Sequence, residues 1–414
     1  DNDDDDTASE CSTIRYAEVG HEPFETFQDK VICEAATLFP RQTATVTRIK
    51  GGSSNRIVGV TICPPAPRKF TWKWLQTQLR KTFGMQVKHQ SQKLIMRIPR
   101  FESSAASMVP DIATLKLAAA KLETPVPEVL SWTASAENAL GRAFMVQKQL
   151  SGQNLALIWD SLNLAQKKSA VRQVVALIKE VGNITSNSAG TVSTDHLHTE
   201  FDDAVKVDTF AVPALGFCVP MTFAKPNAMP GRPQSPADFL IFQCERWREY
   251  QGHCGRVHNK IWDGLVDVVE GLEYHGFISD EDGFYLCHGD LQGYNILVDI
   301  VNERTVRITG VIDWDDAFFA PKFEAFRAPF WTWVDSDKYA MDVEDTVNAP
   351  AVPELEELKK VFEEEAGEEF MCLAYAPEYL IARRLFAIVK NGIFSSYQLE
   401  EAKAIVQDWV ALHP

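Results

Sequence analysis

The most informative part of the sequence is YLCHGDLQGYNILVD, residues 285–299, followed after a short interval by TGVIDWDDA, residues 309–317. Apolar and β-branched residues follow Asn295, and a second such run extends over residues 304–312. This pattern predicts a hairpin of two strands with polar residues at the strand ends. Asn295 and Asp313 would then lie at neighbouring strand ends, on the same side of the hairpin.

Four polar residues in these stretches have the spacing that enzymes of phosphoryl transfer use; they are His288, Asp290, Asn295 and Asp313. His288-Gly289-Asp290 is followed, after four intervening residues, by Asn295, and Asp313 comes eighteen residues later. This order is the H-x-D-x-x-x-x-N pattern with its metal-binding aspartate. We expect Asp290 to accept the proton of an acceptor hydroxyl, and Asn295 and Asp313 to bind Mg²⁺, which prefers hard oxygen ligands. The alternative, turn residues beside buried strands, explains each residue alone but not the ordered set.

The composition narrows the classes of function. The chain has 414 residues and 45% hydrophobic content, enough for two domains with cores, and no apolar run long enough for a membrane span. The net charge of −16 argues against a nucleic-acid partner and is compatible with a cationic acceptor such as an amine or an aminoglycoside.

The expected location is cytoplasmic, because the eight cysteines are dispersed and fit free thiols in a reducing compartment. The chain starts at Asp1 without a methionine, so a removed targeting peptide stays an alternative. The acidic residues at the start predict a disordered tail over residues 1–15.

A glycine turn near the N-terminus is a candidate nucleotide-binding loop. β-branched residues flank Gly51, Gly52, Ser53 and Asn55, which predicts a hairpin whose backbone N–H groups could bind phosphates. An ordinary hairpin without a ligand is the alternative.

A strand predicted over residues 93–99 carries a second candidate, Arg97, whose guanidinium fork suits diphosphate oxygens. A surface arginine is the alternative. Asp111 lies near the start of the most periodic part of the helix predicted over 104–122, and we hypothesise that it anchors Arg97. An acid favoured by the helix dipole explains Asp111 equally well.

The stretch QKQLSG, residues 147–152, has the character of a hinge between two lobes. Backbone groups near Gln147 and Gln149 would contact the base of the nucleotide; a linker without ligand contacts is the alternative. Beyond it the pattern is helical, with a clear amphipathic helix over residues 163–181. Residues 195–232 are rich in loops and could face the acceptor.

Taken together, these motifs resemble the aminoglycoside phosphotransferase and choline-kinase-like family, in particular its fungal members, from about Thr43 to the last helices. The resemblance is carried by Gly51-Gly52 with Asn55, Arg97-Ile98-Pro99, Ser151-Gly152, His288-Gly289-Asp290-Leu291 with Asn295, and Ile312-Asp313-Trp314-Asp315. The sequence departs from the family pattern at Leu291-Gln292-Gly293-Tyr294, where a proline is usual, and at Asp111, where glutamate is commoner.

The resemblance implies an α+β, two-lobe, protein-kinase-like fold. An N-terminal lobe with an antiparallel sheet and one main helix would cover residues 16–148, and a larger, mainly helical catalytic and acceptor-binding lobe residues 149–414. It also implies a small-molecule kinase with ATP or GTP as donor, Mg²⁺, and a small-molecule hydroxyl as acceptor. We expect a monomer or a homodimer. His288 would brace the loop, and Asp315 would be a second metal ligand or a structural acceptor. A catalytically silent, kinase-fold binding protein is the alternative function, distinguished by saturable binding without turnover.

Overall fold

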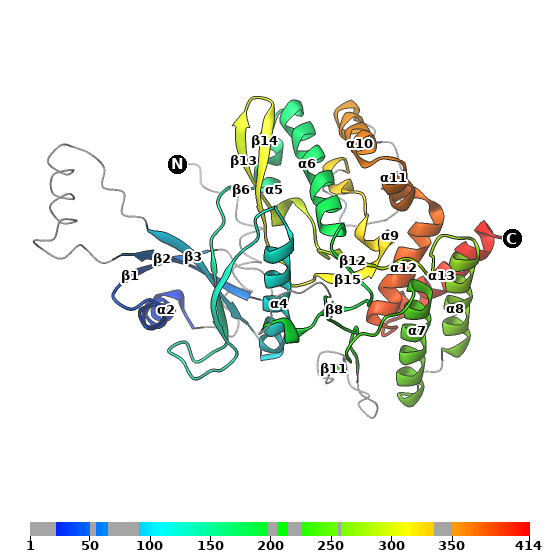
Figure 1. Ribbon diagram of the computed structural model, residues 1–414, viewed down its shortest axis with the longest axis horizontal. Coiled ribbons are helices and arrows are strands. Elements are labelled where there is room, and N and C mark those ends of the chain that lie inside the picture. Colours follow the sequence, from blue (N-terminus) through cyan, green and yellow to red (C-terminus); the bar gives the residue numbers. More distant parts are fainter. Residues whose placement is uncertain are drawn as a thin grey trace, which may run out of the picture. The chain divides into compact units, whose positions relative to one another are not determined.

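The computed structural model describes residues 22–49, 55–64, 91–100, 102–197, 205–213, 226–227, 229–255, 258–334, 350 and 352–414 (Figure 1). For residues 102–107, 213 and 226–227 it describes the backbone alone. The predicted acidic tail and the glycine-turn residues Gly51, Gly52 and Ser53 lie outside this part of the chain.

The chain divides into two compact units. The first comprises residues up to Leu115 together with Pro127–Leu150, and the second comprises Lys116–Val126 and Ser151–Pro414. The elements of the first unit are α2 (Phe24–Leu38), β1 (Thr43–Arg48), β2 (Asn55–Cys63), β3 (Gln92–Pro99), the first part of α4 (Glu102–Lys121), β4 (Val129–Thr133) and β5 (Phe144–Lys148).

The second unit is mainly helical. Its helices are α5 (Leu155–Ile158), α6 (Leu164–Gly182), α7 (Pro236–His253), α8 (Asn259–Tyr274), α9 (Lys322–Ala325), α10 (Pro353–Ala366), α11 (Glu368–Tyr375), α12 (Pro377–Asn391) and α13 (Ser396–Leu412), with short 3₁₀ turns η1 (Trp159–Ser161), η2 (Thr194–Leu197), η4 (Gly293–Asn295) and η5 (Phe330–Thr332). Its strands are β6 (Gln153–Asn154), β7 (Thr185–Ser186), β8 (Thr191–Val192), β9 (Val207–Asp208), β10 (Val212–Pro213), β11 (Pro226–Asn227), β12 (Phe284–Cys287), β13 (Ile296–Asn302), β14 (Thr305–Val311) and β15 (Phe318–Pro321). The predicted combination of an antiparallel-sheet part and a larger helical part is confirmed.

The five strands of the first unit form one antiparallel sheet in the order β1-β2-β3-β5-β4. Side chains alternate between its faces, as pleated strands require. One face is apolar, because β2, β3 and β5 each present every second residue to a core that includes Phe27, Val31 and Ala35 of α2. This explains why the apolar periodicity of residues 24–38 produces a helix that packs on a sheet.

In the second unit, β13 and β14 form the predicted hairpin, with Ile296 opposite Val311. Helix α6 packs along β14 and is seen beside the hairpin in Figure 1. It begins with a capping box, in which Asn163 and Gln166 bond each other's backbone, and this fixes the start that the sequence predicted at residue 163.

Residues 116–126 belong to the second unit, where several of their polar groups form hydrogen bonds. Glu180 of α6 accepts hydrogen bonds from the backbone N–H of Thr124 at 2.9 Å and from its hydroxyl at 2.6 Å. The N–H of Val311 donates to the carbonyl of Pro125 at 3.0 Å. The segment after α4 is thereby attached to the hairpin that precedes Asp313.

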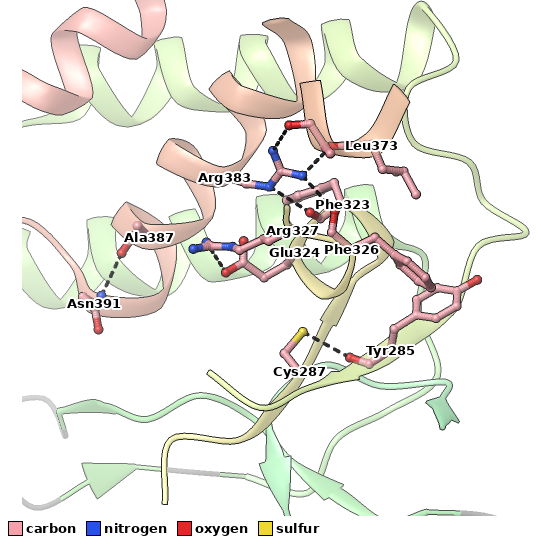
Figure 2. Close-up of polar contacts among 11 residues, drawn as sticks. Tyr285, Cys287, Phe323, Glu324, Phe326, Arg327, Leu373, Arg383, Ala387 and Asn391 are labelled. Carbon is pink, nitrogen blue, oxygen red and sulfur yellow. Dashed lines mark hydrogen bonds and ion pairs between the residues drawn. The ribbon is translucent and has the colours of Figure 1, made fainter. Parts of the chain in front are cut away.

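A buried arginine ties helices α11 and α12 to α9, which directly follows β15. Arg383 of α12 is 3% exposed and donates to the backbone carbonyls of Phe323 at 2.9 Å and Phe326 at 3.3 Å (Figure 2). It also donates to the carbonyls of Ala374 at 3.3 Å and Leu373. Burial lowers the pKa of Arg383 to about 9, so the guanidinium stays charged at neutral pH. Each of these carbonyls at the ends of α9 and α11 thus gains a donor.

Among the helices that the structure describes, none is both long enough and apolar enough to cross a membrane.

Candidate active site

The loop that carries Asp290 is positioned by a strand and a glycine. Strand β12 pairs with β15, with Cys287 opposite Phe318, and runs directly into His288-Gly289-Asp290. Gly289 has φ +82°, and a Cβ there would come within 2.1 Å of the Asp316 carbonyl oxygen. Only glycine fits this turn without a shift of the backbone.

His288 holds this loop against the segment that leads to Asp313. Its side chain is 3% exposed, and Nε2 lies 3.0 Å from the carbonyl oxygen of Ile312. Nδ1 accepts the N–H of Asp290 at 3.4 Å, and the ring lies 4.6 Å from that of Trp314. Burial lowers the pKa of His288 to about 4. These contacts fit a neutral imidazole protonated on Nε2, which orients the loop and takes up no second proton at neutral pH.

The burial of His288 predicts a defined pH dependence of stability. Its pKa is about 4 in the folded chain and 6.5 for an unperturbed histidine. The unfolded state therefore binds the proton first as the pH falls. The contribution is complete above about pH 6.5 and is lost progressively towards pH 4, up to about 3 kcal/mol.

Urea unfolding at pH 7 and pH 4.5 measures this effect. His288→Gln should be less stable than the wild type at pH 7 and lose less stability on acidification, whereas His253→Gln, at an exposed position, should follow the wild type. Equal losses in the wild type and His288→Gln would contradict the expectation.

Asp290 and Asn295 form one hydrogen-bonded pair. The side-chain nitrogen of Asn295 donates to the backbone oxygen of Asp290 at 2.8 Å and to its Oδ2 at 3.0 Å. Both partners are acceptors, so the amide must present its NH₂ group to Asp290. Its oxygen then faces away from Asp290, while the carboxylate is held at a fixed orientation.

A backbone hydrogen bond of the hairpin connects the residue before Asp313 to Asn295. The N–H of Ile312 donates to the carbonyl of Asn295 at 2.9 Å, which brings Asp313 to within one residue of that contact. Asp313 is exposed and has φ +66°, a left-handed conformation that is uncommon outside glycine and often occurs at functional sites. Trp314 is fully buried, with Nε1 3.2 Å from the Val311 carbonyl, and this anchors the turn.

The donor set fits magnesium bound together with nucleotide phosphates. Among the described residues, no three histidines, cysteines or carboxylates gather into a metal-binding group. One carboxylate and one amide oxygen are the sparse protein contribution that Mg²⁺ accepts when phosphates and waters complete its shell.

Three of the predicted nucleotide-binding residues of the first unit, Asn55, Arg97 and Gln147, lie on the same face of its sheet. Residues paired directly across antiparallel strands point to the same face, and Asn55 and Arg97 alternate with the apolar residues of the core. Gln147 of β5 follows the same alternation and is 6% exposed, and its Oε1 is buried without a hydrogen-bond partner. Asp111 is half-buried in α4, in the same unit.

Gln149 is exposed just beyond β5, and its backbone N–H donates to the carbonyl of Lys93 at 3.1 Å. That N–H group is therefore used within the unit. The roles of these five residues towards a nucleotide stay predictions.

A family model shows the family of the chain. The model of the phosphotransferase enzyme family (APH) matches residues 82–324, more than half of the chain, and this range contains Arg97, Asp290, Asn295 and Asp313. The chain belongs to this phosphotransferase family.

Two curated proteins share a short stretch of similar sequence with this chain. Subtelomeric hrmA-associated cluster proteins from two strains of Aspergillus fumigatus are each 26% identical over 103 residues, which is 24% of this chain and 20% of the relative. The match thus spans about a fifth of the length of these curated relatives.

Solved structures of similar fold include aminoglycoside phosphotransferase APH(2'')-Ib with ADP, at 11% identity and TM-score 0.47, covering 93% of this chain and 98% of that one. Aminoglycoside phosphotransferase APH(4)-Ia has 14% identity and TM-score 0.46, covering 93% and 99%. The GDP and kanamycin complex of APH(2'')-IIIa has 15% identity and TM-score 0.41, covering 92% and 94%. The bound nucleotides and kanamycin belong to those proteins.

Tyr294, a residue without a predicted role, contacts Asp290 directly. The hydroxyl of Tyr294 donates to Oδ1 of Asp290 at 2.7 Å. Burial, followed by this bond and the charge of Asp290, raises the pKa of Tyr294 well above its usual value, so the hydroxyl keeps its proton. The sequence signal was the departure from the family pattern at residues 291–294, which contained the tyrosine without indicating where its side chain points.

Proposed function

We propose that the chain is an ATP- and Mg²⁺-dependent kinase that phosphorylates a hydroxyl group of a small molecule. The observation that carries the proposal is the arrangement of Asp290, Asn295 and Asp313. A carboxylate is fixed by an asparagine amide whose oxygen faces away, and an exposed aspartate lies one residue beyond the backbone bond of Ile312 to that asparagine. Membership of a phosphotransferase family supports the same chemistry.

In the proposed reaction, Asp290 accepts a hydrogen bond from the acceptor hydroxyl and takes its proton as the oxygen bonds to the γ-phosphorus. The bond from the γ-phosphorus to the oxygen that it shares with the β-phosphate breaks, and ADP leaves. Asn295 and Asp313 would hold magnesium, which supplies neutralisation of phosphate charge. Arg97, with Asp111 as its anchor, and the segment from Gln147 to Gln149 are the proposed nucleotide contacts of the first unit.

The acceptor is sought by measuring ADP formation across a panel of hydroxylated small molecules. The panel contains aminoglycosides, amino alcohols, sugars and neutral hydroxylated compounds, with ³¹P NMR of the product to locate the new phosphate ester. Acceptor-dependent ADP formation with a phosphate monoester product supports the proposal. Tight, saturable binding of a compound without any ADP formation favours a silent binding protein.

Replacing Asp313 by alanine is expected to weaken binding of Mg²⁺–ATP by about tenfold or more, because one of two protein oxygens for the metal is lost. Calorimetric titration of ATP with and without Mg²⁺ measures this. The matched control is Asp316→Ala, which removes an equal charge from an exposed position three residues away. Equal weakening in both variants would show that Asp313 acts only through its negative charge and not as a metal ligand.

A further inference from the structure

The hydroxyl of Tyr294 is hydrogen-bonded to the carboxylate of Asp290, the group that is proposed to take the acceptor's proton. The tyrosine hydroxyl lies 2.7 Å from Oδ1 of Asp290, while Oδ2 is bonded to Asn295 at 3.0 Å. Both carboxylate oxygens thus already have a donor. The donor on Oδ1 is an O–H group, the kind of donor that an acceptor hydroxyl or a water molecule would bring to the same carboxylate.

The backbone around Tyr294 is fixed on both sides. The side-chain amide of Asn154 donates to the carbonyl of Tyr294, and the indole N–H of Trp331 donates to the carbonyl of Leu291 at 3.2 Å. Gly293 packs so closely on Trp331 that a Cβ would lie 3.0 Å from the indole ring. These contacts hold the main chain of the loop in place without touching the tyrosine hydroxyl.

The side chain itself is open to solvent, since Tyr294 is 50% exposed. Rotation about its side-chain bonds would break the hydrogen bond to Asp290 and leave the loop backbone unchanged. Tyr294 therefore combines a fixed attachment point with a ring that can leave the carboxylate.

We propose that Tyr294 is a displaceable plug that determines the preference of the active site for its acceptor over water. Without an acceptor, the tyrosine hydroxyl holds Asp290 and keeps water from being activated there. A bound acceptor displaces the ring and donates its own hydroxyl to the carboxylate. Tyr294 acts through Asp290, so it is a positioning residue, and the inference rests on the proposed function.

Removing the plug should produce a reaction that needs no acceptor. A water molecule would donate to Asp290, its oxygen would bond to the γ-phosphorus, and the bond to the oxygen shared with the β-phosphate would break. The proton would go to Asp290, and the products would be ADP and inorganic phosphate. This hydrolysis uses only ATP, Mg²⁺ and water, so it can be measured while the acceptor is unidentified.

The test compares ADP release from ATP and Mg²⁺, without acceptor, in three proteins. Tyr294→Ala should raise the rate over the wild type by about tenfold or more, since it removes both the ring and its bond to a charged group. Tyr294→Phe, which keeps the ring and loses the hydroxyl, should lie between the two. The double variant Tyr294→Ala with Asp290→Asn should return to background, and Tyr274→Ala, at an exposed tyrosine of α8, should match the wild type.

The outcomes separate the plug from the proposed function. Magnesium-dependent ATP binding is measured on the same samples by calorimetry, and melting curves confirm that the variants are folded. Binding without an Asp290-dependent rise of ADP release in Tyr294→Ala overturns the plug and leaves the kinase proposal standing. Absence of magnesium-dependent ATP binding in all proteins overturns both.

Discussion

Asp290→Asn is expected to reduce turnover by about 10²–10⁴-fold, the usual contribution of a general base, while the affinity for ATP stays nearly unchanged. The asparagine has the size of the aspartate and can still pair with the Asn295 amide and the Tyr294 hydroxyl, so the loop should keep its shape. What it loses is the ability to accept a proton. Steady-state ADP formation gives the turnover, and calorimetric titration gives the affinity.

The matched control is Asp299→Asn on β13. Asp299 makes a surface ion pair with Arg307, 3.5 Å away, and has no proposed part in the reaction. This variant should keep wild-type turnover. If Asp290→Asn also turned over at a rate within a few-fold of the wild type, Asp290 would not be the base.

Arg383→Met is expected to destabilise the fold by about 3–5 kcal/mol, because it removes a charged donor from a site that was built around it. Four backbone carbonyls, from the ends of α9 and α11, would lose their partner in the interior (Figure 2). Methionine fills the space left by the arginine stem but donates no hydrogen bond. Urea unfolding at pH 7 measures the change.

The neighbouring arginine gives a stringent control. Arg384 is partly exposed and forms ion pairs with Glu401 and Asp408, each at 2.6 Å. Such pairs contribute about 0–1 kcal/mol, so Arg384→Met should cost far less than Arg383→Met. Similar losses for the two variants would show that the carbonyl contacts of Arg383 contribute little.

Part of the site could be predicted from the sequence because it depends on the alternation and periodicity of residues that are close together in the chain. The hairpin that joins Asn295 to Asp313 is short, alternating and continuous in sequence, and the observed strands β13 and β14 reproduce it. The amphipathic helix α6 carries its own capping box and was predicted to within a residue. Each of these features depends on residues close together in the chain, where propensity and periodicity act directly.

Features that depend on distant residues could not be predicted in this way. The bond from Tyr294 to Asp290 depends on a side-chain rotamer and on anchors at Asn154 and Trp331, which have no sequence relation to the motif. The carbonyls around Arg383 come from helix ends about 10 and 60 residues away. Strands of two residues, such as β6 and β7, are too short for any periodic signal.

Binding of Mg²⁺–ATP is tested first by the thermal unfolding of the wild-type protein with ATP and Mg²⁺ together and with either one alone. A ligand that binds only the folded state raises its stability by mass action. We expect a rise in Tm that needs both ATP and Mg²⁺ and that disappears in Asp313→Ala. A folded wild-type protein whose Tm does not change at millimolar ATP and Mg²⁺ would contradict this expectation.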